Sequence, residues 1–480
     1  MKGMKIVIVG AGFTGLQLAR LLIREDNDVT LIDNNDDATI NVSNSLDCEL
    51  LIADGNNLET LEKVGIAKAD ALICVTQSDE VNMITCSLVD AVYPSVLKIA
   101  RVRNYAYYIN SANATQNHAT TFSGNHRPLY GIDFMIHPDV EAADAIVKAV
   151  ENGAIGNVVS FDNSNMQIIQ VQIAADSVFA GRKLMDVRTL TSTPFLITYV
   201  EKDGNTSLAD GNTILESGCT VGILLNKENY KEILSLCGSK KKDFKKIVIV
   251  GAGRIGSLIA EKIIEPKKKN HLNFFGNKNL PHSQDIVIID SNEQLAQAAH
   301  AKFPSARVFT ADATDETFLT DEGLTKFDLA ICATHNHELN MVMAAYLESM
   351  GVAASISLVS TSTLVPIAIK LGVDVAVPLK DVIVDSIMSH LRGNAVKEVH
   401  TISNSELEII ECVIPKDSKI IGKTVKDIAD SSKFLVLLVK RSETDEYEIA
   451  GGNTSFNEND QLVLTSYSDF SKGVLEFFGN

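Results

Sequence analysis

The chain has 480 residues, 45% of them hydrophobic and 22% charged, with a formal net charge of −18 at pH 7. This length predicts two to four domains rather than a single core. The acidic balance argues against nucleic acid as a partner, because phosphate backbones are bound by concentrated Lys and Arg. Seven cysteines, none in a Cys-x-x-Cys pair, predict free, buried thiols in a reducing cytosol.

Membrane targeting is not predicted from the sequence. Residues 1–9 lack signal-peptide architecture and run directly into a strand. A long uncharged stretch, residues 349–369, contains seven Ser or Thr residues and is interpreted as a helix end, a strand and a loop. Any membrane association is therefore expected to come through a partner protein.

The first 135 residues alternate apolar runs with segments of helical period. A helix is predicted to follow at 139–152. From about residue 165, short strands and turns replace the alternation of apolar runs and helical segments. The first pattern is typical of βαβ units in a parallel sheet and the second of a small α+β domain. The apolar runs are Ile6–Val9, Val29–Ile32, Ala71–Val75 and Leu97–Ala100.

The C-terminal half of the chain repeats the N-terminal half. Lys5–Gly15 reappears as Lys246–Gly256 at an offset of 241 residues, and Ala53-Asp54 reappears as Ala311-Asp312 at an offset of 258. Inserts at 267–283 and 109–127 account for the changing offset and are predicted to be surface loops. The predicted domains are two Rossmann domains at 1–137 and 244–378, each followed by a crossover helix and small α+β domain, at 138–238 and 379–480.

A glycine-rich loop follows the first strand of each half. In Gly10-Ala11-Gly12-Phe13-Thr14-Gly15, we expect Gly10 to permit the tight turn, Gly12 to let a pyrophosphate approach the backbone, and Gly15 to let the following helix pack closely. The helix N-terminus would then present N–H groups to the phosphates. In the second half, the corresponding residues are Gly251, Gly253 and Gly256.

An acidic residue ends the second predicted strand of each half. Asp33 lies 18 residues after Gly15, and Asp290 lies 34 residues after Gly256 because of the insert. A carboxylate here accepts hydrogen bonds from ribose hydroxyls and repels a 2′-phosphate, which favours NAD(H) or an adenine nucleotide over NADP(H). The alternative is that the glycines only shape a turn and Asp33 caps a helix.

Further polar residues follow the third, fourth and fifth strands, where ligands of open α/β sheets bind. Asp54, Asp312, Thr76 and Thr334 are candidate nucleotide contacts or, equally, helix N-caps. Arg101 and Arg103 end the fifth strand and could neutralise phosphate. Their counterparts at an offset of 258 are Val359 and Thr361, so the second site is expected to bind differently or more weakly.

Two features of the second half have competing interpretations. Arg254, inside the glycine loop, either contacts a phosphate or faces solvent at the helix start. Cys332, His335 and His337 suggest a metal site only weakly, because their spacing matches no familiar zinc pattern; a loop beside the nucleotide is the alternative. No metal is therefore predicted.

This arrangement resembles the peripheral subunits of Trk potassium-uptake systems, which carry two RCK/KTN modules in one chain. The resemblance covers essentially the whole chain and includes Ala53-Asp54-Gly55, Thr76–Met83, Ile99–Arg103 and the Gly181-x-x-Leu184 and Gly422-x-x-Val425 elements. It departs from the pattern at the two inserts and at His337, which replaces Asp79.

The resemblance implies a cytoplasmic regulator at the inner face of the plasma membrane. It implies a homo-oligomeric ring, expected to be a tetramer, on a membrane potassium-conducting partner that is gated by NAD(H) or ATP/ADP, without catalysis. The implied ligands at the first site are Gly10, Gly12, Phe13, Thr14, Gly15, Asp33, Asp54, Thr76, Arg101 and Arg103. Those at the second are Gly251, Gly253, Arg254, Gly256, Asp290, Asp312 and Thr334.

The main rival is an NAD-dependent oxidoreductase, because the same fingerprint serves dehydrogenases. Such an enzyme needs a proton donor beside the nicotinamide. The sequence has no Tyr-x-x-x-Lys at Tyr105 or Tyr107, and His137 and His400 are isolated. A second rival is a cation/proton-antiporter or amino-acid-sensing domain, with a small ligand bound in the β-rich domains.

Overall fold

The computed structural model divides the chain into two compact units. Unit 1 comprises Met1–Glu141 and Lys380–Leu391, and unit 2 comprises Ala142–Leu379 and Arg392–Asn480. The predicted inserts at 109–127 and 267–283 lie outside the described residues. The structure describes residues 3–25, 27–35, 48–104, 107, 129–151, 153, 158–161, 164–202, 205–238, 244–264, 285–391, 396–402, 406–430, 432–442, 444 and 446–479.

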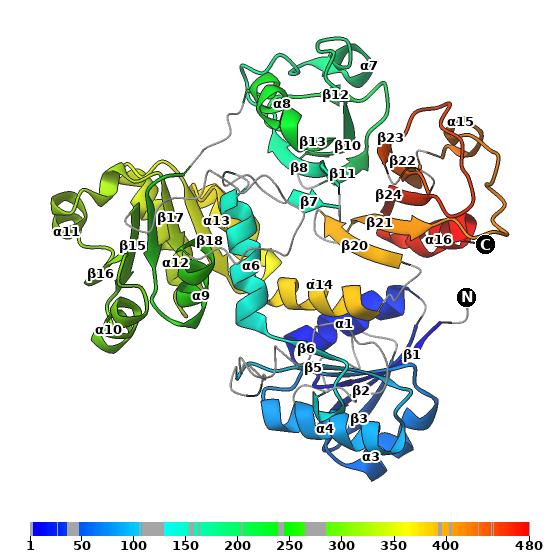
Figure 1. Ribbon diagram of the computed structural model, residues 1–480, viewed down its shortest axis with the longest axis horizontal. Helices are drawn as coiled ribbons and strands as arrows, with labels where there is room; N and C mark the ends of the chain where they lie inside the picture. The colour runs from blue at the N-terminus through cyan, green and yellow to red at the C-terminus, as the bar shows by residue number, and fades with distance from the viewer. Residues whose placement is uncertain are drawn as a thin grey trace. The chain divides into compact units, whose positions relative to one another are not determined.

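Unit 1 contains a six-stranded parallel sheet of order β3-β2-β1-β4-β5-β6 (Figure 1). This is the strand order of a Rossmann-type doubly wound sheet. Its central strands are continuous apolar runs because both faces are covered by helices. The strands are β1 (Lys5–Val9), β2 (Asp28–Asp33), β3 (Glu49–Ile52), β4 (Ala71–Cys74), β5 (Leu97–Arg101) and β6 (Phe134–Ile136), and the helices described between them are α1 (Phe13–Arg24), α3 (Leu58–Lys63) and α4 (Asp79–Val92).

Helix α14 (Leu379–Leu391), from the second half of the chain, covers part of this first sheet. Its side chains Ile383, Val384, Ile387, Met388 and Leu391 join one buried cluster with side chains of α1 and of the strands. Figure 1 shows α14 alongside α1. The sheet is therefore completed by a segment that follows it by more than 200 residues.

Unit 2 contains the second parallel sheet, in the same order, β16-β15-β14-β17-β18-β19. Helix α6 (Pro138–Glu151) contributes its residues from Ala142 onward to this unit, and Asp144 pairs with Lys262 of α9 at 2.7 Å. The strands are β14 (Ile247–Val250), β15 (Ile286–Asp290), β16 (Arg307–Thr310), β17 (Leu329–Cys332), β18 (Ser355–Val359) and β19 (Val375–Pro378), with helices α9 (Arg254–Ile264), α10 (Glu293–Lys302), α11 (Glu316–Asp321), α12 (His337–Ser349) and α13 (Val365–Leu371).

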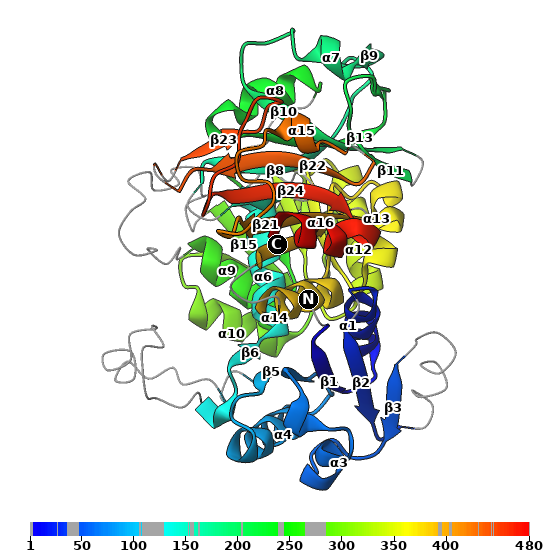
Figure 2. The same cartoon turned by 90° about the vertical axis from the view of Figure 1, so that its right-hand side faces the viewer.

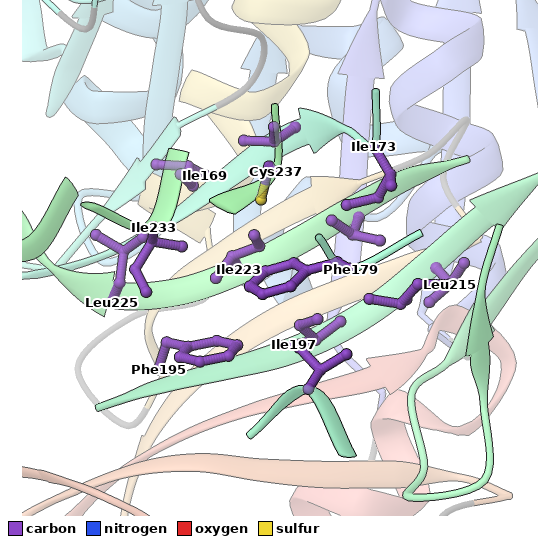
Figure 3. Packing of buried hydrophobic residues seen from close by; sticks show 14 of the residues in the cluster. Ile169, Ile173, Phe179, Phe195, Ile197, Leu215, Ile223, Leu225, Ile233 and Cys237 are labelled. Atoms are coloured by element: carbon purple, nitrogen blue, oxygen red, sulfur yellow. The ribbon is translucent and has the colours of Figure 1, made fainter. Parts of the chain in front are cut away.

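The first small domain is an antiparallel sheet of order β11-β10-β13-β8-β7, covered on one face by α8 (Tyr230–Leu236). Figure 3 shows its core, in which Phe179, Phe195 and Ile233 pack with aliphatic side chains of the strands. The elements are β7 (Val158–Ser160), β8 (Met166–Gln172), β9 (Arg182–Lys183), α7 (Leu184–Val187), β10 (Phe195–Lys202), β11 (Asn205–Leu208), β12 (Ile214–Leu215) and β13 (Thr220–Asn226).

The second small domain repeats this sheet with the order β20-β21-β24-β22-β23. Its strands and helices are β20 (Val396–Ile402), β21 (Leu407–Val413), α15 (Val425–Ile428), β22 (Phe434–Lys440), β23 (Tyr447–Ile449), β24 (Gln461–Tyr467) and α16 (Ser471–Gly479). The two small sheets share one buried cluster, which joins Leu196 and Leu224 to Ile409 and Leu438. Figure 2 shows β22 and β24 close to β8 and β13.

The fold class predicted from the sequence is confirmed: two parallel Rossmann-like sheets, each followed by a small α+β sheet. All seven cysteines are free, as predicted, and six of them are buried, whereas Cys48 is half-buried and departs from the prediction. Among the described residues, no helix combines the length and apolar character needed to cross a membrane.

Candidate functional site

The first glycine loop connects β1 to α1, and each of its glycines meets different surroundings. Gly10 has a φ of 111°, and a Cβ there would lie 2.9 Å from the Thr76 backbone nitrogen. A Cβ on Gly15 would lie 1.8 Å from the Gly10 carbonyl oxygen, whereas one on Gly12 would meet nothing within 4 Å. Gly10 and Gly15 are therefore required by the loop itself, and Gly12 presents open backbone.

The second glycine loop has the same geometry. Gly251 has a φ of 108°, a Cβ on Gly256 would lie 1.8 Å from the Gly251 carbonyl oxygen, and Gly253 is again open. The tight turn expected of the first glycine agrees with this geometry, and the pyrophosphate contact expected of the open second glycine stays a prediction. A side chain at the third glycine would collide first with the carbonyl oxygen of the first glycine, and its contacts with neighbouring side chains are longer.

The start of α1 leaves its N–H groups available to a ligand. Gly12 is the N-cap, no side chain of the described chain caps this helix, and its first turn carries no acidic residue. Phe13 is 38% exposed and Thr14 is buried. Unsatisfied N–H groups and the helix dipole at such an end favour an anion.

The predicted ribose-binding acids are held in place by the glycine loops. The Asp33 carboxylate accepts hydrogen bonds from the Ala11 nitrogen at 2.6 Å and the Asn35 nitrogen at 2.9 Å. Asp290 accepts from the Ala252 nitrogen at 2.7 Å and the Asn292 nitrogen at 2.8 Å. Each acid therefore lies directly beside its loop and fixes that loop's conformation.

Asp54 and Asp312 follow β3 and β16. Asp54 accepts from the Asn34 side chain at 2.9 Å, which places it next to Asp33. Asp312 accepts from the backbone and hydroxyl of Thr314, and these hydrogen bonds lower the pKa of its carboxyl group.

The alternative that these residues and the two threonines are helix N-caps is wrong. The caps of the four helices that follow are Asn57, Ser78, Asp315 and Asn336. In each half, the helix begins two or more residues beyond the predicted position, because a turn separates it from the strand. The candidates Asp54, Asp312, Thr76 and Thr334 thus lie in the connections at the carboxyl ends of strands.

Thr76 is fixed by a buried asparagine. The Asn82 side-chain oxygen accepts from the Thr76 nitrogen at 2.9 Å and hydroxyl at 2.7 Å, and its amide donates to the carbonyls of Thr76 and Arg101. Asn82 is fully buried. Asn340 makes the same bonds to Thr334 and to the Leu358 carbonyl.

Sequence analysis did not assign a role to Asn82 or Asn340. The signal was present in the repeat, where an asparagine stands six residues after the threonine in both halves. A buried polar side chain with every atom bonded holds neighbouring strand ends in register.

Two guanidinium groups surround the connection after β4. The Arg101 side chain donates to the Thr76 carbonyl at 2.6 Å, and that of Arg103 donates to the Gln77 carbonyl. Burial, together with the charge of Arg103, lowers the pKa of Arg101. Asp79 accepts from the Arg103 nitrogen at 2.9 Å and lies 3.8 Å from its guanidinium. Through Thr76, which Gly10 also approaches closely, the cations lie close to the first loop.

The second half lacks this set of charges. Because Asn82 bonds the Arg101 carbonyl and Asn340 the Leu358 carbonyl, Leu358 is the structural counterpart of Arg101. The aligned positions are thus Leu358 and Ser360, which corrects the predicted Val359 and Thr361. The expectation that the second site lacks both cations still holds. His337, which replaces Asp79, begins α12.

The described residues offer no metal-binding cluster of three or more His, Cys, Asp or Glu side chains. Cys332 lies on β17 with its side chain in the buried cluster beneath α12, and burial raises the pKa of its thiol. Arg254 is exposed at the start of α9.

Comparisons with known proteins match this architecture. The TrkA-N domain model matches residues 6–119 and 247–378, and the TrkA-C domain model matches residues 409–478. The chain is 26% identical over 465 residues to the Trk system potassium uptake protein TrkA of Halomonas elongata, covering 96% of this chain and 95% of the relative. It is 25% identical to the protein of the same name from Haemophilus influenzae, covering 98% and 97%.

Solved structures show the same fold. The GsuK RCK domain superposes with a TM-score of 0.54 at 17% identity, covering 100% of this chain and 95% of the other. A GsuK channel bound to NAD also gives a TM-score of 0.54, and the match covers 100% of this chain and 79% of the channel chain. With two TrkA-N domains, a TrkA-C domain and full-length similarity to TrkA proteins, the chain belongs to the TrkA family of Trk potassium-uptake proteins.

Proposed function

We propose that this chain is a non-catalytic, nucleotide-sensing regulatory subunit that gates a membrane potassium-conducting partner. The observation that carries the proposal is the pair of open glycine loops, each with an anchored acid beside it. The named function of the TrkA relatives, potassium uptake, supplies the process. The subunit is proposed to act as a homo-oligomeric ring, a tetramer, on the cytoplasmic face of the plasma membrane.

The proposed ligand is NAD(H), with ATP or ADP as the other adenine nucleotides. An acid at the end of β2 or β15 suits two free ribose hydroxyls and disfavours a 2′-phosphate. The GsuK channel has been solved with NAD and, separately, with ADP. The proposed ligand residues are Gly10, Gly12, Phe13, Thr14, Gly15, Asp33, Asp54, Thr76, Arg101 and Arg103 in the first site, and Gly251, Gly253, Arg254, Gly256, Asp290, Asp312 and Thr334 in the second.

The first site is proposed to bind phosphates more tightly than the second. Arg101 and Arg103 carry the positive charge at the edge of the first sheet, and Leu358 and Ser360 occupy those positions in the second. A nucleotide can move the gate only if it binds two conformations of the assembly with different affinity.

The test is calorimetric titration of the full chain with NADH, NAD, ATP and ADP, together with Asp33→Ala and Asp290→Ala variants. We expect micromolar binding at two sites of unequal affinity, with each variant losing one of them. NADH absorbance is followed over time with candidate metabolites as the control for the oxidoreductase alternative. Absence of binding, or steady NADH oxidation, contradicts the sensor proposal.

Gating requires a separate measurement. Potassium uptake is followed in cells that carry the membrane partner and either the wild-type chain or the Asp33→Ala variant. The proposal predicts that the variant changes the rate of uptake without changing the amount of either protein. Equal uptake with the two chains would leave nucleotide binding without a regulatory consequence.

A further inference from the structure

Lys380 reaches the first glycine loop from the other half of the chain. It lies at the start of α14, and its ammonium is 4.8 Å from the centroid of the Phe13 ring. Phe13 is the first residue of α1 and directly follows the open Gly12. A cation from residue 380 thus contacts the side chain that directly follows the backbone assigned by the proposed function to a pyrophosphate.

The position of Lys380 is set by the packing of its helix. Ile383, Ile387 and Leu391 lie in the same buried cluster as Leu18 and Leu22 of α1. At the other end of α14, the ring of His390 stacks on that of Phe134, with centroids 4.1 Å apart. The helix is therefore fixed along its length, and the ammonium is held near the loop rather than ranging through solvent.

The contact that holds the ammonium is one it can exchange for a phosphate. Within the described part of the chain, no carboxylate forms an ion pair with Lys380, and the ammonium lies over the ring of Phe13, a residue that is 38% exposed. A cation–π contact at such a place is weak. A charge-assisted hydrogen bond to a phosphate oxygen is stronger.

The second half differs at both positions. At the repeat offset of 241, Phe13 corresponds to Arg254 and Lys380 to Asp139, so the repeat has a cation in the second glycine loop and an acid at the matching position of α6. The lysine is thus a property of the first site. It adds to the asymmetry already given by Arg101 and Arg103.

We propose that Lys380 binds the pyrophosphate of the nucleotide in the first site, moving from the Phe13 ring to a phosphate oxygen. This inference rests on the proposed function and deepens it. Because α14 continues at both ends into unit 2, a nucleotide held by Gly12 and Lys380 is bonded to segments from both halves of the chain. Occupancy of the first site is thereby coupled to the crossover segment.

The experiment uses the full chain in a Gly253→Ala background, which isolates the first site. ADP and adenosine are titrated by calorimetry against this protein and its Lys380→Met and Lys380→Arg variants. Methionine keeps the apolar stem and removes the charge. We expect Lys380→Met to weaken ADP binding about tenfold and Lys380→Arg much less. Adenosine binding should be unchanged, because it has no phosphate.

Two controls separate the outcomes. Lys63→Met, at an exposed lysine at the end of α3, should leave ADP affinity unchanged, and the melting temperature of every variant shows whether it folds. ADP affinity equal in Lys380→Met and its parent overturns the role of Lys380 while leaving the proposed function intact. Failure of the parent to bind ADP or NADH overturns both. An equal loss of ADP and adenosine binding would show that the lysine only supports the structure.

Discussion

Gly12 and Gly15, three residues apart in the first loop, should respond to alanine in opposite ways. A Cβ on Gly12 meets nothing within 4 Å, so Gly12→Ala should keep the stability of the ligand-free protein and lose nucleotide affinity. A Cβ on Gly15 lies 1.8 Å from a backbone oxygen, so Gly15→Ala should lose about 2 kcal/mol or more of stability. Urea unfolding followed by circular dichroism and a nucleotide titration distinguish the two. Unchanged affinity in Gly12→Ala would contradict the pyrophosphate position.

Asn82 should be the most sensitive polar residue of the first site. Its side chain satisfies Thr76 and the Arg101 carbonyl from a fully buried position. Asn82→Ala removes these bonds and leaves buried groups unsatisfied, which should cost about 2–4 kcal/mol. The matched variant Asn340→Ala should cost a similar amount in unit 2, whereas Ser78→Ala, which removes only a helix cap, should cost about 1 kcal/mol. If Asn82→Ala loses no more stability than Ser78→Ala, the hydrogen bonds of Asn82 do not hold the strand ends of this site together.

Helix α14 should respond to mild acid through His390. Burial lowers the pKa of this histidine, which stacks on Phe134. The unfolded chain therefore takes up a proton before the folded chain does, so stability is complete above the ordinary value of about 6.5 and is lost as the pH falls below it. Between about pH 7.5 and 5.5, the urea midpoint of the wild type should fall more than that of His390→Phe. The variant His300→Gln, at an exposed histidine of α10, is measured alongside as the control.

The Rossmann strands and the crossover helices were predictable to within a residue or two. Their apolar runs and the repeat identify them: the helix expected at 139–152 spans Pro138–Glu151, and the crossover helix expected after residue 378 spans Leu379–Leu391. What periodicity could not supply is the sheet against which each helix packs. An amphipathic stripe shows that Ile383 and Ile387 are buried but does not identify their partners.

The candidate sites divide in the same way. The glycine loops and Asp33 follow from local spacing, and the structure places them together. The helix caps that the structure shows and the hydrogen bonds of Asn82 depend on residues brought together by the fold. So does the contact between Lys380 and Phe13, which are 367 positions apart. The predicted alignment of Arg101 is wrong by one residue because the offset of 258 ends after α12, and the pairing of Cys74 with Ala100 and of Cys332 with Ser357 gives the true register.

The two halves of the molecule should be energetically coupled through their small sheets. Leu196 of the first and Leu438 of the second lie in one buried cluster. Each change to alanine should cost about 2–5 kcal/mol, and the double variant should depart from the sum by about 0.5–3 kcal/mol. The control pair, Ile223 and Ile410, lies in two separate clusters and should add within about 0.5 kcal/mol. Additivity in both pairs would mean that the shared cluster carries no coupling.

The long-range pairing of α14 with the first sheet also sets an order of events during synthesis. The sheet is complete at Ile136, but the helix that covers its α1 face begins at Leu379. At a synthesis rate of about 5–20 residues per second, that apolar face waits roughly 12–50 seconds for its cover. A nascent chain halted between residues 136 and 379 should therefore bind chaperones and be cleaved by protease in the first domain. Synthesis of the rest of the chain should abolish both chaperone binding and cleavage.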